Sequence, residues 1–490
     1  MGKYKYLANN IVLFSVSNFV SKILVFLLVP FYTGILTTAE YGTADVFQTT
    51  LLLTVPALTV NMGEAALRFG IGNADSRGLI FRIGLKYTLR ASLIVFAGGI
   101  AASFFAPFGL TVMFVLLFFT DSVYEFLILF FQGCELVKIV VSGSIFSTLI
   151  LILSNLLCLL VLKLGLYGYL ISQMAAYFLA SVFMLALAGR NHGEVFETGD
   201  LGEGNRPKGS KGDPKKQLEK EMLDYGKPMI FYSTGAWINN AADRYFVSAI
   251  CGLAVNGLYG VAYKIPSILT VFQRIFAQAW QMSATREKAG EDEGEDARIK
   301  STAFYSEMYR LYLTFMVLGC GFLILFVKPL AFFLFRKDFY EAWRFVPPLL
   351  ISVVFGAMTG FLGSICLAYK DSKSMGAACG IGAAVNVVLN LLLIPEFSAM
   401  GAAFATAVSY LIMYIMAFLF VRKHVKLETD ILRDVTALLC LSAEAAVMIN
   451  GAGDLRTFAV CAGICLILVL INLRWIRTIL QTVAKRLKRG

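Results

Sequence analysis

The stretch NLLCLLVLKLGLYGYLISQMAAY, residues 155–177, decides the fold, because it joins two apolar helices through a short turn. It recurs as NLLLIPEFSAMGAAFATAVSY at residues 390–410, with the Asn-Leu-Leu run, a Gly and the final Tyr in the same order. A bilayer crossing needs about 20 apolar residues, and helices on both sides of each turn meet that length. The recurrence predicts two similar membrane-embedded halves.

A second recurrence supports this division. EYGTADVF at residues 40–47 reappears as LYGVAYKI at residues 258–265, so that both contain a Tyr-Gly pair at the same position. The two recurrences pair the second helix with the eighth, and the fifth and sixth with the eleventh and twelfth, without inverting them. We therefore predict parallel six-helix repeats, an arrangement that surrounds a central cavity in transporters.

Composition excludes the common soluble classes. The chain has 490 residues, of which 58% are apolar and 15% charged, too few charges for a soluble protein of this length. A cytosolic enzyme, a nucleic-acid binder and a secreted disulfide scaffold are excluded on this ground.

Both histidines, His192 and His424, lie outside the apolar runs, so no metal site or proton relay built from histidine is expected within the membrane. We expect the nine cysteines to be small buried hydrophobes.

We predict an all-α polytopic membrane protein with about 14 transmembrane helices, arranged as two parallel six-helix lobes and a C-terminal helix pair. The apolar runs lie at 11–36, 44–67, 85–106, 110–132, 140–162, 166–188, 228–250, 258–282, 303–327, 346–368, 375–394, 399–421, 434–450 and 457–473.

Basic residues give the expected orientation. If the N-terminus is cytoplasmic, 30 Lys and Arg residues fall on the cytoplasmic side and six on the other, which favours cytoplasmic termini at both ends. The predicted domains are an N-lobe with helices 1–6 at 1–188, a cytoplasmic linker at 189–227, a C-lobe with helices 7–12 at 228–425, and helices 13–14 with a basic cytoplasmic tail at 426–490.

Cations within the predicted spans are the candidate substrate-binding residues, because a charge in the bilayer usually faces a wet cavity or a partner. On helix 8, Lys264, Ser267 and Arg274 share one polar stripe with Gln278 and Gln281. A cavity lined by several cations favours an anion such as phosphate or pyrophosphate. The six substrate-binding candidates are Lys22, Arg68, Arg244, Lys264, Arg274 and Arg310.

Acids at depth supply candidates for ion coupling. Asp121 and Glu125 are one turn apart on helix 4, so their like charges favour a shared proton or a bound cation. A structural pairing with Arg90 on helix 3 is the alternative. Glu64 and Arg68 are spaced i,i+4, so their opposite charges would neutralise each other. No metal ligand set and no catalytic residue is predicted.

The sequence also resembles a known family at three stretches. VPFYTGILTTAEYG (29–42) resembles the N-terminal half of Wzx-like polysaccharide or oligosaccharide flippases of the multidrug/oligosaccharidyl-lipid/polysaccharide exporter superfamily. ADRYFVSAICGLAVNGLYGVAYKIP (242–266) resembles their junction of helices 7 and 8, and LAYKDSKSMGAACGIGAAVNVVLNLLLIPEFSAMGAAFAT (367–406) their helices 10 to 12. Helices 13 and 14 match less clearly.

The resemblance implies a non-enzymatic flippase of the cytoplasmic membrane. It would move an undecaprenyl-pyrophosphate-linked oligosaccharide, a repeat unit of a surface polysaccharide, from the inner to the outer leaflet by alternating access. The cationic residues would bind the pyrophosphate. No cofactor is implied beyond coupling to H⁺ or Na⁺, and the implied partners are membrane lipids, a polysaccharide polymerase and glycosyltransferases, with no nucleic acid. The alternatives are a peptidoglycan-precursor flippase and a multidrug and toxin extrusion antiporter.

Overall fold

The computed structural model describes residues 26–71, 74–196, 214–290, 295–451 and 455–477. Across these ranges the regular elements are helices. The chain divides into two compact units, the first containing residues 26–36 and 43–237 of the described part, and the second residues 37–42 and those from 238 onward. The all-helical prediction is therefore confirmed.

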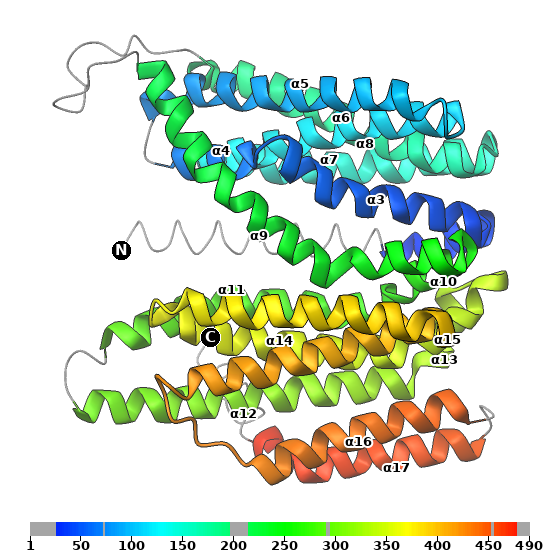
Figure 1. Cartoon of the computed structure of the whole chain (residues 1–490), viewed down its shortest axis with the longest axis vertical. Helices are drawn as coiled ribbons and strands as arrows, with labels where there is room; N and C mark the ends of the chain where they lie inside the picture. The colour runs from blue at the N-terminus through cyan, green and yellow to red at the C-terminus, as the bar shows by residue number, and fades with distance from the viewer. Residues whose placement is uncertain (1–25, 72–73, 197–213, 291–294, 452–454, 478–490) are drawn as a thin grey trace. The chain divides into compact units, whose positions relative to one another are not determined.

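Unit 1 is a bundle of long antiparallel helices, drawn from blue to green in Figure 1. Its elements are α2 (Val29–Ile35), α3 (Thr38–Leu58), α4 (Met62–Gly70), α5 (Arg77–Ala102), α6 (Phe108–Gly133), α7 (Val137–Asn155), a π-helical turn (Leu156–Val161), α8 (Gly165–Asn191) and the first part of α9 (Pro214–Cys251). Phe126, Phe130 and Phe131 of α6 are almost fully buried at its core. Because α6 packs against α4, α5 and α8, it is the central helix of the unit.

The second predicted span is broken. Its two parts, α3 and α4, meet at an angle of 60°. Pro56 lies inside the last turn of α3, and the residues that follow, Val60 and Asn61, have φ values of 56° and 50°. Pro removes a helical hydrogen bond and a left-handed backbone ends a helix, which explains why the apolar run 44–67 does not form one rod.

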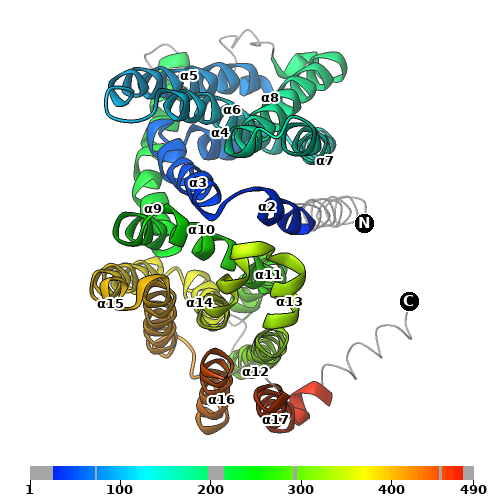
Figure 2. The same cartoon turned by 90° about the vertical axis from the view of Figure 1, so that its right-hand side faces the viewer.

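Unit 2 contains the remainder of the chain. Its elements are the second part of α9, α10 (Leu253–Ala262), α11 (Lys264–Gly290), α12 (Glu295–Leu325), α13 (Val327–Leu334), the 3-10 helix η6 (Lys337–Phe345), α14 (Val346–Ala368), α15 (Ser372–Val421), α16 (Ile431–Asn450) and α17 (Leu455–Ile471). The strongly buried α14 packs against α11, α12 and α15. Trp280 of α11 stacks on Phe361 of α14 with 4.3 Å between ring centroids. Figure 2 shows α12, α16 and α17 side by side.

The recurring stretches at residues 155–177 and 390–410 have related turns in the two units. In unit 1 the fully buried Asn155 is followed by Lys163 with φ 51°, and in unit 2 the fully buried Asn390 is followed by Ser398 with φ 55°. Ser398 interrupts the long element α15, so α15 contains the predicted spans 375–394 and 399–421. A Cβ atom on Gly401 would lie 2.3 Å from the carbonyl oxygen of Leu393, so the second helix approaches the first too closely for any larger residue.

A glycine crossing joins the start of α3 to α10 within unit 2. A Cβ atom on Gly42 would lie 1.9 Å from the carbonyl oxygen of Leu253, and one on Gly257 would lie 1.9 Å from that of Thr38. The side-chain amide of Asn256 donates to the carbonyl oxygen of Gly42 at 3.2 Å. The first turn of α3 therefore belongs with unit 2, although the rest of that helix belongs with unit 1.

Six helices in the described residues are long and apolar enough to cross a membrane, or seven if α3 and α4 form one bent span. This finding makes the chain a multi-pass membrane protein. The count of 14 remains a prediction, since α15 contains two of the predicted spans and residues 1–25 lie outside the described part.

The end of the predicted linker has a defined structure. Residues 214–227 form the first turns of α9, where Met222 is fully buried and Leu218 packs against the core of unit 1. The change from one unit to the other falls after Trp237, later than the expected linker end at residue 227. Leu218, Met222 and Tyr225 follow helical spacing, which supplies the apolar contact that a solvated linker lacks.

Candidate functional site

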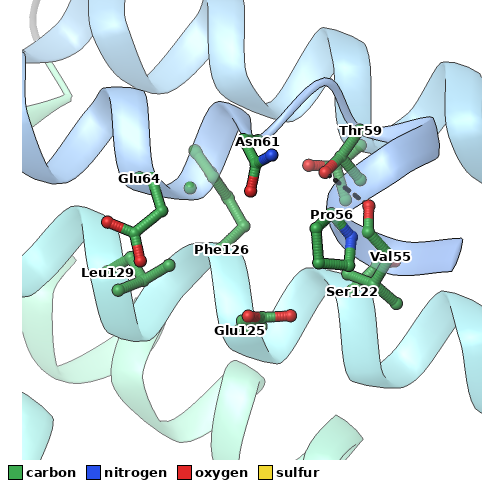
Figure 3. A pocket seen from close by; sticks show the side chains of 11 residues that line it. Val55, Pro56, Thr59, Asn61, Glu64, Ser122, Glu125, Phe126 and Leu129 are labelled. Atoms are coloured by element: carbon green, nitrogen blue, oxygen red, sulfur yellow. Dashed lines mark hydrogen bonds between the residues drawn. The ribbon is translucent and has the colours of Figure 1, made fainter. Parts of the chain in front are cut away.

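A small polar pocket lies at the break between α3 and α4 in unit 1. Its volume is about 20 Å³, enough for one water-sized particle. Figure 3 shows Glu64 of α4 and Glu125 of α6 at its wall, with Asn61 above them. Thr59, Thr88 and Ser122 complete the polar part of the lining. Two carboxylates on one pocket repel each other when both are ionised, so the pocket favours a proton or a cation between them.

Asn61 contributes a buried hydrogen-bond donor to the pocket. Asn61 is 5% exposed and its Oδ1 accepts a long hydrogen bond from Ser233 of α9 at 3.4 Å. Its Nδ2 atom is buried and has no hydrogen-bond partner among the described residues. A buried donor requires an acceptor, such as a water molecule or a carboxylate oxygen. The pocket is large enough for a water molecule that would accept from Nδ2 and donate to the carboxylate of Glu64 or Glu125.

Of the two acids predicted for ion coupling, the structure places one in this pocket. Glu125 lines it, whereas Asp121, one turn earlier on α6, does not. Asp121 is half-buried and lies close enough to Glu125 for the two charges to interact. The second carboxylate of the pocket is that of Glu64 and not that of Asp121. Among the described residues no ion pair joins Glu64 to Arg68, whose guanidinium lies over the ring of Tyr225 at 5.2 Å, so the self-neutralising pair is not formed.

Asp243 is the centre of a second polar cluster, in unit 2. It is 3% exposed and accepts hydrogen bonds from Tyr259 at 2.6 Å and Tyr263 at 2.7 Å. Thr406 of α15 donates to it at 3.3 Å, and the backbone N–H of Arg244 donates at 2.9 Å. These hydrogen bonds satisfy the buried side chain of Asp243, and they join α9, α10 and α15 at one point.

This cluster also positions Arg244. The guanidinium of Arg244 lies 4.7 Å from the centre of the Tyr263 ring, a cation–π contact. Lys264 follows Tyr263 directly, as the first residue of α11, so Tyr263 is a contact of Arg244 and the chain neighbour of Lys264. Both side chains are half-buried.

The polar stripe of α11 lies away from the core of unit 2. Ile265, Leu269 and Trp280 on one face are almost fully buried, whereas Arg274 is exposed. Arg274 stands ten residues after Lys264, a rise of about 15 Å along the helix. The stripe from Lys264 to Arg274 is therefore available to a ligand that reaches this face of unit 2.

The other predicted cations are elsewhere. Arg310 lies on α12 with its guanidinium over the ring of Trp475 at 5.4 Å. Arg68 and Arg90 are exposed on unit 1, and Arg90 lies over the ring of Tyr87 at 5.4 Å. Lys22 lies outside the described residues. Within those residues no group of three His, Cys, Asp or Glu side chains is placed to hold a metal ion.

Sequence reasoning missed the roles of four residues in these sites. Asn61 and Glu64 enter the pocket only because α3 breaks, and Pro56 was the signal for that break. Tyr259 and Tyr263 were seen as part of a recurring motif, yet their i,i+4 spacing also places both hydroxyls on one face of the helix. That spacing could have identified them as partners for a buried acid.

Two helical units with several helices long and apolar enough to cross a membrane define a multi-pass membrane protein. The model of the family described as "Polysaccharide biosynthesis protein" matches residues 7–281, more than half of the chain. The chain belongs to this polysaccharide biosynthesis family.

Comparisons with solved structures agree on the fold. The chain is similar to a lipid II flippase MurJ in an inward closed conformation, with a TM-score of 0.65 and 15% identity over 96% of this chain and 100% of that one. It is also similar to an inward-facing multidrug resistance MATE transporter of the MOP superfamily, with a TM-score of 0.64 and 12% identity over 82% of this chain and 94% of that one. A point mutant of the Vibrio cholerae MATE transporter VcmN gives a TM-score of 0.58 and 11% identity over 86% and 98%.

A curated relative adds a further match. An uncharacterised membrane protein of Methanocaldococcus jannaschii is 26% identical over 216 residues, which are 42% of this chain and 40% of that protein. The chain therefore matches less than half of the length of this relative. The resemblance to flippases noted in the sequence is confirmed at the level of family and fold.

Proposed function

We propose that the chain is a flippase for an undecaprenyl-pyrophosphate-linked oligosaccharide, the repeat unit of a surface polysaccharide. It would move this lipid from the inner to the outer leaflet of the cytoplasmic membrane by alternating access, with both termini in the cytoplasm. Membership of the polysaccharide biosynthesis family supports a glycan-related cargo. We propose no catalytic step, since flipping needs binding and reorientation but no bond making.

The observation that carries the proposal is the cationic stripe of α11. Lys264 and Arg274 are about 15 Å apart along one helix, on a face that the core of unit 2 leaves open. Arginine forms paired hydrogen bonds to phosphate oxygens, and two cations at this spacing suit a pyrophosphate followed by a charged or hydroxylated glycan. An organic cation would be repelled. Arg244, held over Tyr263 beside Lys264, would add a third contact, and Lys22 a fourth.

We propose that the pocket at the α3–α4 break couples transport to an ion, with Glu125 and Glu64 as its carriers and Asp121 as a neighbour. The unsatisfied Nδ2 of Asn61 favours protons over Na⁺. In proteoliposomes, Glu125→Gln should remove the effect of a pH gradient on transport. If transport depended on a Na⁺ gradient alone, and this dependence persisted in Glu125→Gln, the assignment would be contradicted.

The test of the cargo is genetic. Deletion of the gene in its host should cause the completed lipid-linked repeat unit to accumulate on the inner leaflet, and the wild-type gene should relieve this. We also expect that a polymerase and glycosyltransferases act on the same lipid before and after it is flipped. If the peptidoglycan precursor accumulated instead, the chain would be a precursor flippase, a function that its fold also allows. If no lipid-linked glycan accumulated and the cells became drug sensitive, a MATE-type antiporter would be the better assignment.

A further inference from the structure

Four side chains form a compact group at one end of unit 2, and we call it the Trp475 cluster. It consists of the indole of Trp475 and the guanidinium groups of Arg310, Arg433 and Arg474. Their Cζ atoms lie 5.4, 5.8 and 5.6 Å from the centre of the indole ring. The cluster unites three helices that pack against one another, since Arg310 is on α12, Arg433 on α16 and Trp475 just after α17.

Hydrogen bonds beside the cluster join α12 to the segment before α16 and to the segment after α17. Thr314 of α12 donates to Asn472 after α17 at 3.0 Å. The backbone N–H of Glu428, in the segment before α16, donates to Ser306 of α12 at 2.9 Å. Tyr309 and Tyr414 share a hydrogen bond between their hydroxyls. The residues of the cluster are therefore held by helices that hydrogen bonds join to one another.

Carboxylates satisfy the guanidinium groups of Arg310 and Arg433 only in part. Arg433 is paired with Asp434 through Nε at 2.9 Å and Nη2 at 2.6 Å. Arg310 lies 4.0 Å from the carboxylate of Glu428, which is 74% exposed and so contributes little. Nε of Arg310 and Nη1 of Arg433 are buried and have no hydrogen-bond partner among the described residues. Buried guanidinium donors without acceptors are costly, which calls for an anion at this place.

The surroundings indicate that this anion belongs to a lipid. Ile431 and Leu432, beside Arg433, are 55% and 79% exposed, and Leu470, just before Trp475, is 59% exposed. Exposed apolar side chains next to a group of arginines match the boundary between acyl chains and phosphate groups, where tryptophan is also enriched. A free phosphate ion would gain nothing from the apolar part.

We propose that the Trp475 cluster binds the phosphate group of an anionic phospholipid. The planar guanidiniums, held beside the indole by cation–π contacts, donate paired hydrogen bonds to the phosphate oxygens. The acyl chains lie along the exposed leucines of α16 and α17. The cluster contains no residue of the α11 stripe, and its test measures lipid binding and not transport.

The experiment is a titration of the full-length protein, purified in detergent and stripped of lipid, with phosphatidylglycerol, phosphatidylcholine or inorganic phosphate. The thermal unfolding midpoint reports binding. Phosphatidylglycerol should raise the midpoint at low lipid ratios, and the double variant Arg310→Gln/Arg474→Gln should need about tenfold more of it, equivalent to about 1.4 kcal/mol. Arg344→Gln is the matched control, because Arg344 lies over Trp343 at 5.9 Å elsewhere in unit 2 and is paired with Glu341 at 2.9 Å.

Two milder variants test the same site in case the double variant does not fold. Arg474→Lys keeps the charge but loses the paired hydrogen bonds, and Trp475→Leu removes the stacking surface, so each should weaken binding of phosphatidylglycerol by several fold. Equal midpoints in phosphatidylcholine and phosphatidylglycerol would overturn the proposal, as would equal lipid affinity in all cluster variants. An equal rise with millimolar inorganic phosphate would overturn the lipid assignment in favour of a soluble anion.

Discussion

At the scale of single residues, the structure separates cations that the sequence had grouped together. Arg274 and Lys264 remain on one open face of α11, whereas Arg310 belongs to the Trp475 cluster. Both arginines lie seven or eight residues from the cytoplasmic end of their predicted spans, so depth in the sequence does not distinguish them. The packing partners of α11 and α12 make the difference.

Arg274→Ala should reduce transport of the lipid-linked glycan by about tenfold or more, because a charge-assisted contact to phosphate is worth about 1.5–3 kcal/mol. The protein should still insert into the membrane and unfold at an unchanged temperature, since Arg274 is exposed. Transport in proteoliposomes, measured beside Arg344→Ala as a surface arginine outside the stripe, checks this. Full activity of the Arg274 variant would remove the α11 stripe from the cargo site.

Glu444 is a second residue whose role depends on packing. It is fully buried on α16, and neither carboxylate oxygen has a hydrogen-bond partner among the described residues. A buried polar group without a partner costs about 1–3 kcal/mol, so Glu444→Leu should stabilise the protein by that amount. The unfolding midpoint in detergent is the measurement, with the exposed Glu396→Leu as the control. A lower midpoint in Glu444→Leu would show that this carboxyl has a partner or a function.

At the scale of elements, α9 is the helix that the sequence described least well. Its first turns fall within a Gly- and Lys-rich stretch, yet they are fixed to unit 1 by Glu219. The carboxylate of Glu219 lies 2.6 Å from the ammonium of Lys86 and accepts from the Tyr87 hydroxyl at 2.9 Å. The hydrogen bond from Lys86, with that from Tyr87, lowers the pKa of Glu219 from its ordinary value.

Glu219→Gln should release these turns, and hydrogen exchange across residues 214–227 should become faster. Glu221→Gln is the matched control, because Glu221 accepts a local bond from Gln217 of the same helix and makes no ion pair with another element of the described chain. Since the folded pKa of Glu219 lies below the ordinary value, its contribution is complete above about pH 4.5 and is lost as the pH falls through the folded pKa. Protection that is unchanged in the variant, or lost only at alkaline pH, would refute this anchor.

At the scale of the whole molecule, the distribution of basic residues predicts the orientation. With 30 of 43 Lys and Arg residues on one side, the segment 197–213 should be cytoplasmic and η6 external. Single cysteines at Ser210 and at Lys337, introduced after the nine native cysteines are replaced, should react with an impermeant reagent in opposite preparations. Lys337 should be labelled in intact cells, and Ser210 only in inverted vesicles. The reverse pattern would invert the predicted topology.

The sequence by itself determined the class of fold, because hydrophobic runs, their recurrence and the asymmetry of basic residues depend on composition along one dimension. It also determined which residues carry charge within apolar surroundings. Only the tertiary structure decided how these charges are used. Glu64 reaches the pocket because α3 breaks after Pro56, Asp243 is satisfied by a threonine 163 residues away, and three arginines converge on one tryptophan. Such contacts join residues far apart in the chain, and no local periodicity specifies them.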